Sequence, residues 1–317
     1  MEIKDYYKGD EVDILQLFKT VYGREMSYEY WKWRFENNPA GKYMIKLMWE
    51  GEKLIGHYAV SPVMLSVNRE NCLSTLSMTT MTHQDYGGRG IFPQLANALY
   101  HQLENELEVK AIWGFPNQNS HYSFLKKLKW QDLGIISHLG LILEKVKAGS
   151  HPNIRSFTLF KTAHRNISLK VASGFPVHVY RDEKYLNWRY NDNPTSNYDK
   201  FEFIDSENEG YIVVKKFSKP GDNGNFDLFI TEIGIEPQKM PLFPLFLSHI
   251  KDYYGKQANS INTWLSLFDE RHIQLEKLGF SIGGKPTFIG VRPNDDLQKT
   301  LSDFRNWYYT YSDSDIY

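Results

Sequence analysis

The stretch TTMTHQDYGGRGIFP, residues 79–93, decides how the rest of the chain is interpreted. Its first residues are mostly apolar or threonine and predict a strand, and a loop with three glycines follows. The next stretch, QLANALYHQL at residues 94–103, carries apolar side chains at helical spacing. A glycine loop between a strand and a helix leaves backbone N–H groups at the helix N-terminus, where the helix dipole also favours an anion. The stretch therefore predicts a phosphate site, which we interpret as a pyrophosphate site.

The composition limits the class of protein. The chain has 317 residues, with 37 Lys and Arg against 38 Asp and Glu, so its net charge is -1. This length allows two domains, and the charge balance gives no support for a nucleic-acid partner or a polybasic membrane contact. Cys72 is the one cysteine, which excludes an internal disulfide and a cysteine-based metal cluster, and we expect no metal. The polar N-terminus and the lack of a long apolar run predict a cytoplasmic protein without a membrane span.

Other elements are expected around the glycine loop. Residues 11–21 have the pattern of an amphipathic helix, and Ser27 can cap a short aromatic helix. Residues 72–82 form the strand before the loop, and residues 109–115 form a short buried strand after the loop's helix. Residues 134–143 are expected to be one strand that closes the same sheet.

The second half of the chain repeats the first. YLNWRYNDNP at residues 185–194 matches YWKWRFENNP at residues 30–39, and LEKLGF at 275–280 matches LKKLKW at 125–130. Between these two matches a second Phe-Pro pair, Phe243-Pro244, follows a strand pattern as Phe92-Pro93 does. Three matches in the same order indicate two copies of one α/β unit.

The repeat predicts the domains. We expect a first domain over residues 1–146, a second over 152–291 and a C-terminal segment over 292–317. In the second domain QKMP, residues 238–241, stands where the first has GGRG, residues 87–90. No glycine remains there, and Pro241 lacks a backbone donor. The second copy is therefore expected to keep the fold and to lose the phosphate site.

This order of elements resembles the GCN5-related N-acetyltransferase (GNAT) superfamily. The resemblance rests on YGGRGI at residues 86–91 after a strand and FLKKLKW at residues 124–130 near the end of the unit. The family's loop usually reads Arg/Gln-x-x-Gly-x-Gly/Ala; Gly88 and Gly90 match its Gly-x-Gly core, whereas Gly87 and Phe92 depart from it.

The resemblance implies an α/β (α+β) fold. Two tandem GNAT-like units are implied, each a mixed, mostly antiparallel central sheet flanked by helices. An intact unit followed by a degenerate one is similar to double-GNAT proteins, including those of bacterial surface-polysaccharide gene clusters.

The resemblance also implies acetyl-CoA as acyl donor and assigns its site. Backbone of the strand before the loop would lie against the pantetheine arm, and one N–H there would face the thioester oxygen. The loop would hold the pyrophosphate, and an asparagine after the next strand would hold pantetheine. The implied cofactor-binding residues are Met81, Thr82, Gly87, Gly88, Arg89, Gly90, Ile91, Phe92, Asn117 and Asn119. A tight turn without a ligand, a solvated charge at Arg89 and an N-cap at Asn119 are the simpler alternatives.

Acid and base candidates follow from the same resemblance. Tyr122 is the candidate general acid for the departing thiolate, although the family's usual slot falls on Leu125, and a core aromatic is the alternative. The strand 72–82 carries no carboxylate, and His57, His83 and Asp85 lie nearer in the sequence. His83 is the candidate base because histidine titrates in the neutral pH range, and a structural or solvated histidine is the alternative.

The chain end offers a second source of base. In double-GNAT proteins that acetylate aminoglycosides, the C-terminal carboxylate serves this role. Here four large aromatics, Trp307, Tyr308, Tyr309 and Tyr311, precede the end and predict a docked tail. Asp313, Asp315 and the terminal carboxylate of Tyr317 are the candidates, and a tail packed only for stability is the alternative.

These expectations define the function to be tested. We expect an acyl-CoA-dependent N-acyltransferase in which a small-molecule primary amine, such as that of an amino sugar, attacks the thioester directly. A non-catalytic acyl-CoA-binding sensor and a Fem-type aminoacyl transferase are the alternatives. The expected partners are an acyl-CoA and an amine acceptor, with a homodimer allowed.

Overall fold

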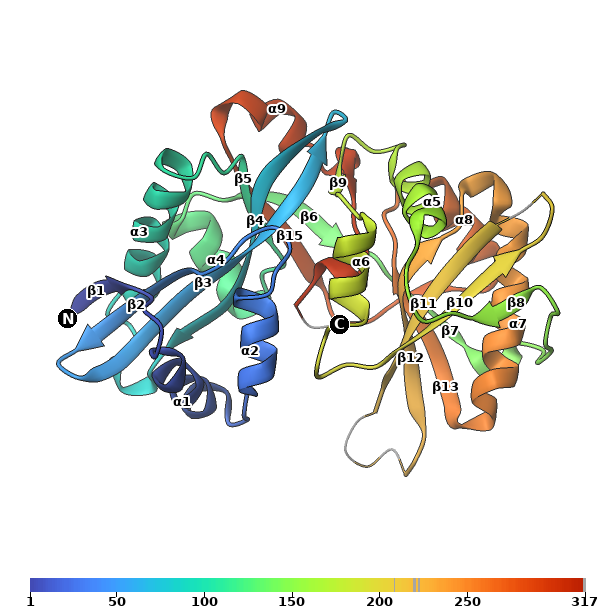
Figure 1. The fold of residues 1–317 in the computed structure, drawn as a ribbon, viewed down its shortest axis with the longest axis horizontal. Coiled ribbons are helices and arrows are strands. Elements are labelled where there is room, and N and C mark those ends of the chain that lie inside the picture. The colour runs from blue at the N-terminus through green and yellow to red at the C-terminus, as the bar shows by residue number, and fades with distance from the viewer. Residues whose placement is uncertain (208, 219–220, 222, 316–317) are drawn as a thin grey trace. The chain divides into compact units, whose positions relative to one another are not determined.

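The computed structural model describes residues 1–207, 209–218, 221 and 223–315. Two compact units divide the chain (Figure 1). Unit 1 comprises residues 1–134 and 287–304, and unit 2 comprises residues 135–286 and 305–317. Among the described residues, none of the helices combines the length and the apolar character that crossing a bilayer requires.

Unit 1 is a mixed sheet covered by helices on both faces. Its helices are α1 (Glu11–Tyr22), α2 (Tyr28–Phe35), α3 (Ile91–Asn105), α4 (Gln118–Lys127) and α9 (Gln298–Leu301). Its strands are β1 (Glu2–Asp5), β2 (Met44–Glu50), β3 (Lys53–Val67), β4 (Glu70–Thr82), β5 (Ala111–Gly114), β15 (Thr287–Pro293) and β6 (Gln131–Ile136). They follow the order β1-β2-β3-β4-β5-β15-β6, in which β4 and β5 are parallel.

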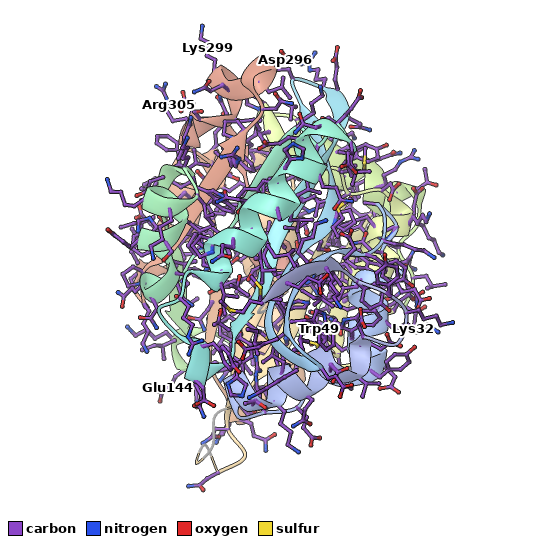
Figure 2. The ribbon with its side chains drawn as sticks, turned by 90° about the vertical axis from the view of Figure 1, so that its left-hand side faces the viewer. Lys32, Trp49, Glu144, Asp296, Lys299 and Arg305 are labelled. Carbon is purple, nitrogen blue, oxygen red and sulfur yellow. The ribbon has the colours of Figure 1, made fainter. Side chains whose placement is uncertain are left out.

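Two apolar clusters hold the helices of unit 1 to its sheet. The first joins α3 and α4 to the sheet and includes Leu95, Leu99, Phe124 and Trp130; α3 crosses the sheet in Figure 2. The second joins α1 and α2 to the sheet and includes residues such as Leu17. The predicted helices are confirmed, because α1 covers the expected range and the Ser27 hydroxyl accepts a hydrogen bond from the Tyr30 N–H at 3.1 Å.

Unit 2 repeats this arrangement. Its helices are α5 (Thr162–Ala172), α6 (Glu183–Tyr190), α7 (Phe243–Tyr254) and α8 (Glu270–Lys277). Its main strands are β7 (His138–Ile142), β8 (Ile154–Ser156), β10 (Tyr198–Ile204), β11 (Glu209–Phe217), β12 (Phe226–Gly234), β13 (Ala258–Trp264) and β14 (Ser281–Ile282). They follow the order β14-β7-β13-β12-β11-β10-β8, with β12 and β13 parallel. The prediction of two mixed sheets flanked by helices is therefore confirmed.

Each sheet takes in sequence from the other half of the chain. Residues 134–143, expected as one closing strand, form the end of β6 and all of β7, and β7 lies between β13 and β14 in unit 2. Conversely, β15 lies between β5 and β6 in unit 1. Leu139 and Leu141 explain the placement of β7, because both are buried in the apolar core of unit 2. The polar residues 144–152, a candidate linker by composition, lie within unit 2.

The equivalent helices α4 and α8 of the two units end differently. Lys129 follows α4 and has left-handed backbone (φ +57°), whereas Gly279, its counterpart after α8, has φ +95°. A left-handed residue with a side chain costs free energy that glycine avoids.

We predict that Lys129→Gly raises the free energy of unfolding by about 1 kcal/mol. Gly279→Ala is the reciprocal variant and should lower it by about 1 kcal/mol, because alanine is strained at a φ of +95°; the added Cβ itself makes only an ordinary contact with Leu141 at 3.4 Å. Urea denaturation at equilibrium measures both changes. An unchanged midpoint for Lys129→Gly would show that its backbone conformation is not strained.

Candidate functional site

The glycine loop joins β4 to α3 through one short turn. Residues Gln84–Tyr86 form this turn, which the Gly87 N–H closes by donating to the Gln84 carbonyl at 3.1 Å. Gly88 (φ +76°) and Gly90 (φ +72°) have left-handed backbone, and Gly90 is the N-cap of α3. The backbone conformation therefore requires the two glycines that match the expected Gly-x-Gly core.

A row of backbone donors follows in this loop. Five consecutive N–H groups of this loop donate to no acceptor in the described part of the chain. They belong to Gly88, Arg89, Gly90, Ile91 and Phe92. Pro93 has no N–H, and Gln94 makes the first helical bond, to the Gly90 carbonyl at 3.2 Å. No acidic side chain lies in the first turn of α3, so the positive end of its dipole is not neutralised locally. This row can bind a phosphate group.

The strand before the loop separates from its parallel neighbour. The pairing of β4 with β5 ends at Leu76 and Trp113, although β4 continues to Thr82. Met81 and Thr82 still pair with β3 on the other side. The end of β4 is therefore held by one neighbour only, and its other edge can pair with an extended ligand.

A bulge in β4 marks the place of this separation. The register with β3 shifts between His57 and Ala59, and Thr79 has left-handed backbone (φ +51°), which is rare for a β-branched residue. The His57 ring nitrogen Nδ1 lies 2.8 Å from the Thr79 carbonyl, and the Tyr22 hydroxyl donates to the Thr80 carbonyl at 2.8 Å. These bonds hold the bulge in place. His57 is fully buried, and burial lowers its pKa to about 4.

Helix α4 begins directly beyond β5. Its N-cap is Asn117, whose side-chain oxygen accepts hydrogen bonds from the N–H groups of Asn119 and Ser120 at 3.0 and 3.1 Å. The N-cap role considered for Asn119 therefore belongs to Asn117, and Asn119 is exposed in the first turn. Tyr122 is 65% exposed, so the alternative of a core aromatic is wrong. Leu125, in the family's usual tyrosine slot, packs against the apolar core.

The comparison with known families agrees with this geometry. The sequence model of the Acetyltransferase (GNAT) domain matches residues 2–132, which include the split strand, the glycine loop and α4. Residues 2–132 therefore form a GNAT domain. The comparison with curated proteins gives no match.

Solved structures of transferases share the fold of most of the chain. A probable N-acyltransferase from Enterococcus faecalis has 14% identity and a TM-score of 0.68, covering 92% of this chain and 72% of its own. A GCN5-related N-acetyltransferase from Anabaena variabilis has 12% identity and a TM-score of 0.69, with the same coverage. N-myristoyltransferase from Saccharomyces cerevisiae, solved with bound myristoyl-CoA, has 10% identity, a TM-score of 0.62 and coverage of 92% and 82%.

His83 lies at the junction of β4 and the glycine loop. Its N–H extends the β3–β4 ladder by donating to the Ile55 carbonyl at 2.9 Å. Its Nδ1 accepts a hydrogen bond from the Asp85 N–H at 3.3 Å, and its ring lies edge-on to Tyr86 at 5.7 Å. The imidazole is therefore oriented by the turn.

Of the predicted C-terminal segment, residues 292–304 belong to unit 1, and the described residues 305–315 dock within unit 2. Asp313 is buried, and both of its carboxylate oxygens accept from Arg181 at 2.8 Å. Arg181 also pairs with Glu232 at 3.2 Å, and Arg189 donates to the Ser312 carbonyl at 2.9 Å. Burial raises the pKa of Asp313. Both oxygens are engaged, so this carboxylate is held as a structural anchor.

The other tail candidates differ from Asp313 in their placement. Asp315 is exposed. Tyr317 lies outside the described residues.

In unit 2 a side chain lies where the equivalent parallel strands separate. Its parallel strands β12 and β13 also stop pairing early, at Ile230 and Thr263. Arg271 of α8 donates to the carbonyls of Ile233 and Ile235 at the end of β12, at 2.9 and 3.2 Å. Asp269 fixes the guanidinium through bonds of 2.9 and 2.6 Å. In unit 2 a buried side chain therefore binds the backbone acceptors at the point where the parallel strands separate.

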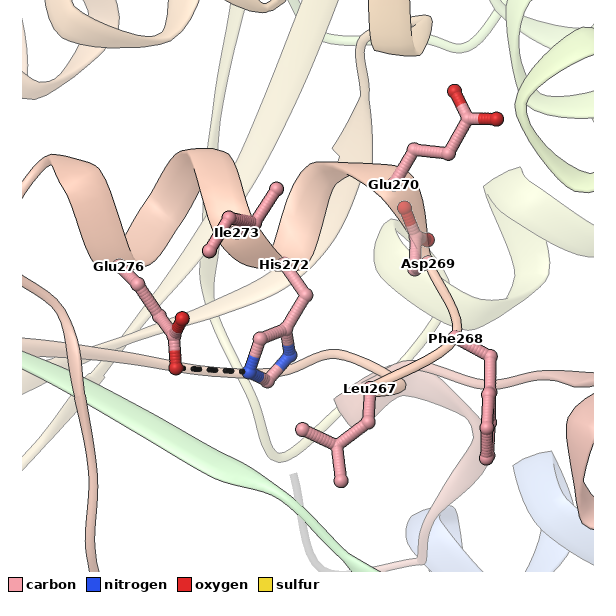
Figure 3. A pocket seen from close by; sticks show the side chains of 7 residues that line it. All are labelled: Leu267, Phe268, Asp269, Glu270, His272, Ile273 and Glu276. Atoms are coloured by element: carbon pink, nitrogen blue, oxygen red, sulfur yellow. Dashed lines mark ion pairs between the residues drawn. The ribbon is translucent and has the colours of Figure 1, made fainter.

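A shallow hollow of about 340 Å³, with Asp269 in its lining, lies next to this ion pair (Figure 3). Side chains of the β13–α8 loop and α8 line it, among them Leu267, Phe268 and Ile273, and His272 pairs with Glu276 at 3.6 Å.

The turn Pro237–Leu242, which replaces the glycine loop in unit 2, contains two prolines. Among the described residues, no group of three or more His, Cys, Asp and Glu side chains could hold a metal ion.

Two features of the site were missed from the sequence. The bulge at Thr79 and its clamp by His57 depend on pairing with a strand more than twenty residues away, and no local residue pattern marks them. Burial along β3 is continuous from Leu54 to Val63, so no alternation distinguishes His57 from its neighbours.

The buried His57 gives a prediction for stability against pH. Its folded pKa is about 4 against an ordinary value of 6.5, so the unfolded chain binds the proton first as the pH falls. The stability that the neutral His57 contributes is fully present above pH 6.5 and is lost as the pH falls towards 4. Between pH 7 and 5, this residue should remove roughly 2 kcal/mol of unfolding free energy.

The matched variant is His57→Gln, which retains an amide donor for Thr79. It should lose about 2 kcal/mol less than the native protein between the two pH values, measured by urea denaturation. Equal losses in both proteins would contradict a neutral, buried His57.

The tail gives a separate prediction. Asp313→Asn should lower the free energy of unfolding by about 3 kcal/mol, because it breaks a buried ion pair. Asp315→Asn at an exposed position should have a much smaller effect. Thermal and urea unfolding of both variants measure the difference, and a native-like Asp313→Asn would remove the anchor role.

Proposed function

We propose that the protein is an acyl-CoA-dependent N-acyltransferase, with acetyl-CoA as donor and a small-molecule primary amine as acceptor. The observation that carries the proposal is the row of N–H groups from Gly88 to Phe92 beside the free edge of β4, a combination found in unit 1 and replaced in unit 2. The row suits a pyrophosphate, and the free edge suits the amides of a pantetheine arm.

The acyl group would pass directly from CoA to the amine, without an intermediate on the protein. The amine nitrogen attacks the thioester carbonyl, a C–N bond forms, the C–S bond breaks and CoA leaves as a thiolate. A backbone N–H at Met81 or Thr82 would stabilise the oxyanion, and the clamp by His57 would hold that backbone in place. The exposed Tyr122 would protonate the thiolate.

The amine must lose a proton before it attacks. His83 would accept this proton, because its ring is fixed by the turn that precedes the glycine loop. Asp315 and the carboxylate of Tyr317 remain candidates. Amino sugars are the first acceptors to test, since they combine a primary amine with a polar ring that exposed tyrosines can contact.

A non-catalytic acyl-CoA sensor is the second candidate. One observation favours it: Leu125 takes the family's tyrosine slot and packs against the apolar core, so an acid must come from Tyr122, one turn earlier.

The test is calorimetric titration with acetyl-CoA, followed by thiol release with a panel of amino sugars. One acetyl-CoA should bind per chain, and Gly90→Asp should weaken binding by at least about 100-fold, because a carboxylate and a strained φ enter the anion site.

Gly174→Asp is the matched control. It introduces the same side chain at an exposed site in unit 2 where a Cβ meets nothing within 4 Å. Retained binding in Gly90→Asp would overturn the proposal. Binding without thiol release from any amine would favour the sensor.

A further inference from the structure

A cluster of charged side chains around Tyr86 adjoins the glycine loop. The guanidinium carbon of Arg89 lies 4.8 Å from the centre of the Tyr86 ring, and the Lys53 Nζ lies 5.4 Å from it. The Tyr86 hydroxyl donates to Glu50 at 2.6 Å, which ties the ring to the β2–β3 hairpin. We call Glu50, Lys53, Tyr86 and Arg89 the Tyr86 platform.

The platform gathers positive charge that the protein does not neutralise directly. Within the described chain, neither Lys53 nor Arg89 forms an ion pair with a carboxylate, and both side chains are exposed. Glu50 is engaged by the tyrosine hydroxyl, and the nearby Asp85 lies 3.6 Å from His83 Nδ1. Two cations on one ring repel each other, and a bound anion would relieve that repulsion.

The chemistry of the proposed donor supplies such an anion. CoA carries a phosphate monoester at the 3′ position of the ribose whose 5′ carbon bears the pyrophosphate. Only the ribose separates the two groups, so a pyrophosphate on the N–H groups of Gly88 to Phe92 brings the monoester close to the loop. The monoester is largely dianionic at neutral pH. A guanidinium offers it several donors and an ammonium a compact charge.

We propose that the Tyr86 platform binds the ribose 3′-phosphate of the acyl-CoA and makes the site selective against 3′-dephospho-CoA. Lys53 and Arg89 are the contacting groups, and Tyr86 holds their side chains beside the loop. This inference rests on the proposed function, because it requires a CoA pyrophosphate in the loop.

The experiment compares two ligands that differ by one phosphate. Calorimetric titration of the full chain should give a Kd for CoA roughly tenfold below that for 3′-dephospho-CoA. Lys53→Met and Arg89→Met should each weaken CoA binding and leave 3′-dephospho-CoA binding nearly unchanged, so the ratio of the two Kd values falls towards one. Thermal unfolding checks that these exposed variants remain folded.

Lys299→Met is the matched control. Figure 2 places Lys299 at the opposite end of unit 1 from Trp49, the neighbour of Glu50, so its removal changes the net charge alone and should preserve the ratio. Equal affinity for both ligands in the native protein would overturn the inference. Loss of affinity for both ligands in the same proportion would assign Lys53 and Arg89 to the pyrophosphate and also overturn it. Failure to bind either ligand would instead contradict the proposed function.

Discussion

The parallel pairing of β4 with β5 ends at Leu76 and Trp113, and the rest of the site depends on that early end. Backbone N–H and C=O groups are costly to leave unpaired once water is excluded. A strand that leaves its neighbour while still anchored on its other side must therefore find new partners. In unit 1 the His57 ring and the Tyr22 hydroxyl bind the carbonyls of Thr79 and Thr80, and beyond Leu76 β4 pairs with no second strand of the described protein, which fits a strand-like ligand. The glycine loop that follows extends the same row of donors around a corner to the start of α3.

Unit 2 meets the same constraint with a side chain. There the end of β12 gives its carbonyls to Arg271, and Asp269 balances the charge that this burial introduces. Paired buried charges are tolerated when their hydrogen bonds are complete, which this guanidinium achieves. The contrast between the units explains why loss of the glycine loop did not unfold the second copy: the fold needs partners for the diverging strand, and a ligand is one of two ways to supply them.

Several parts of the structure were predictable because their causes are local. Ser27 caps α2 through its own hydroxyl, and the glycines at 88 and 90 adopt the left-handed backbone that their loop requires. Other parts were not predictable. Asn117 and Asn119 are both near the start of α4, and only the backbone path decides that Asn117 is the cap. Residues 134–143 carry an apolar pattern that suits either sheet, and burial of Leu139 and Leu141 in unit 2 decides the matter.

The sequence by itself determined the repeat, the single glycine loop and the class of anion that such a loop can hold, because these follow from residue spacing and from the conformations that glycine permits. Only the tertiary structure decided that β7 and β15 exchange places between the sheets, that Asp313 anchors the tail on Arg181, and that His57 secures the bulge at Thr79. Each of these rests on contacts between residues far apart in the chain. Such contacts depend on pairing and burial that no local pattern encodes.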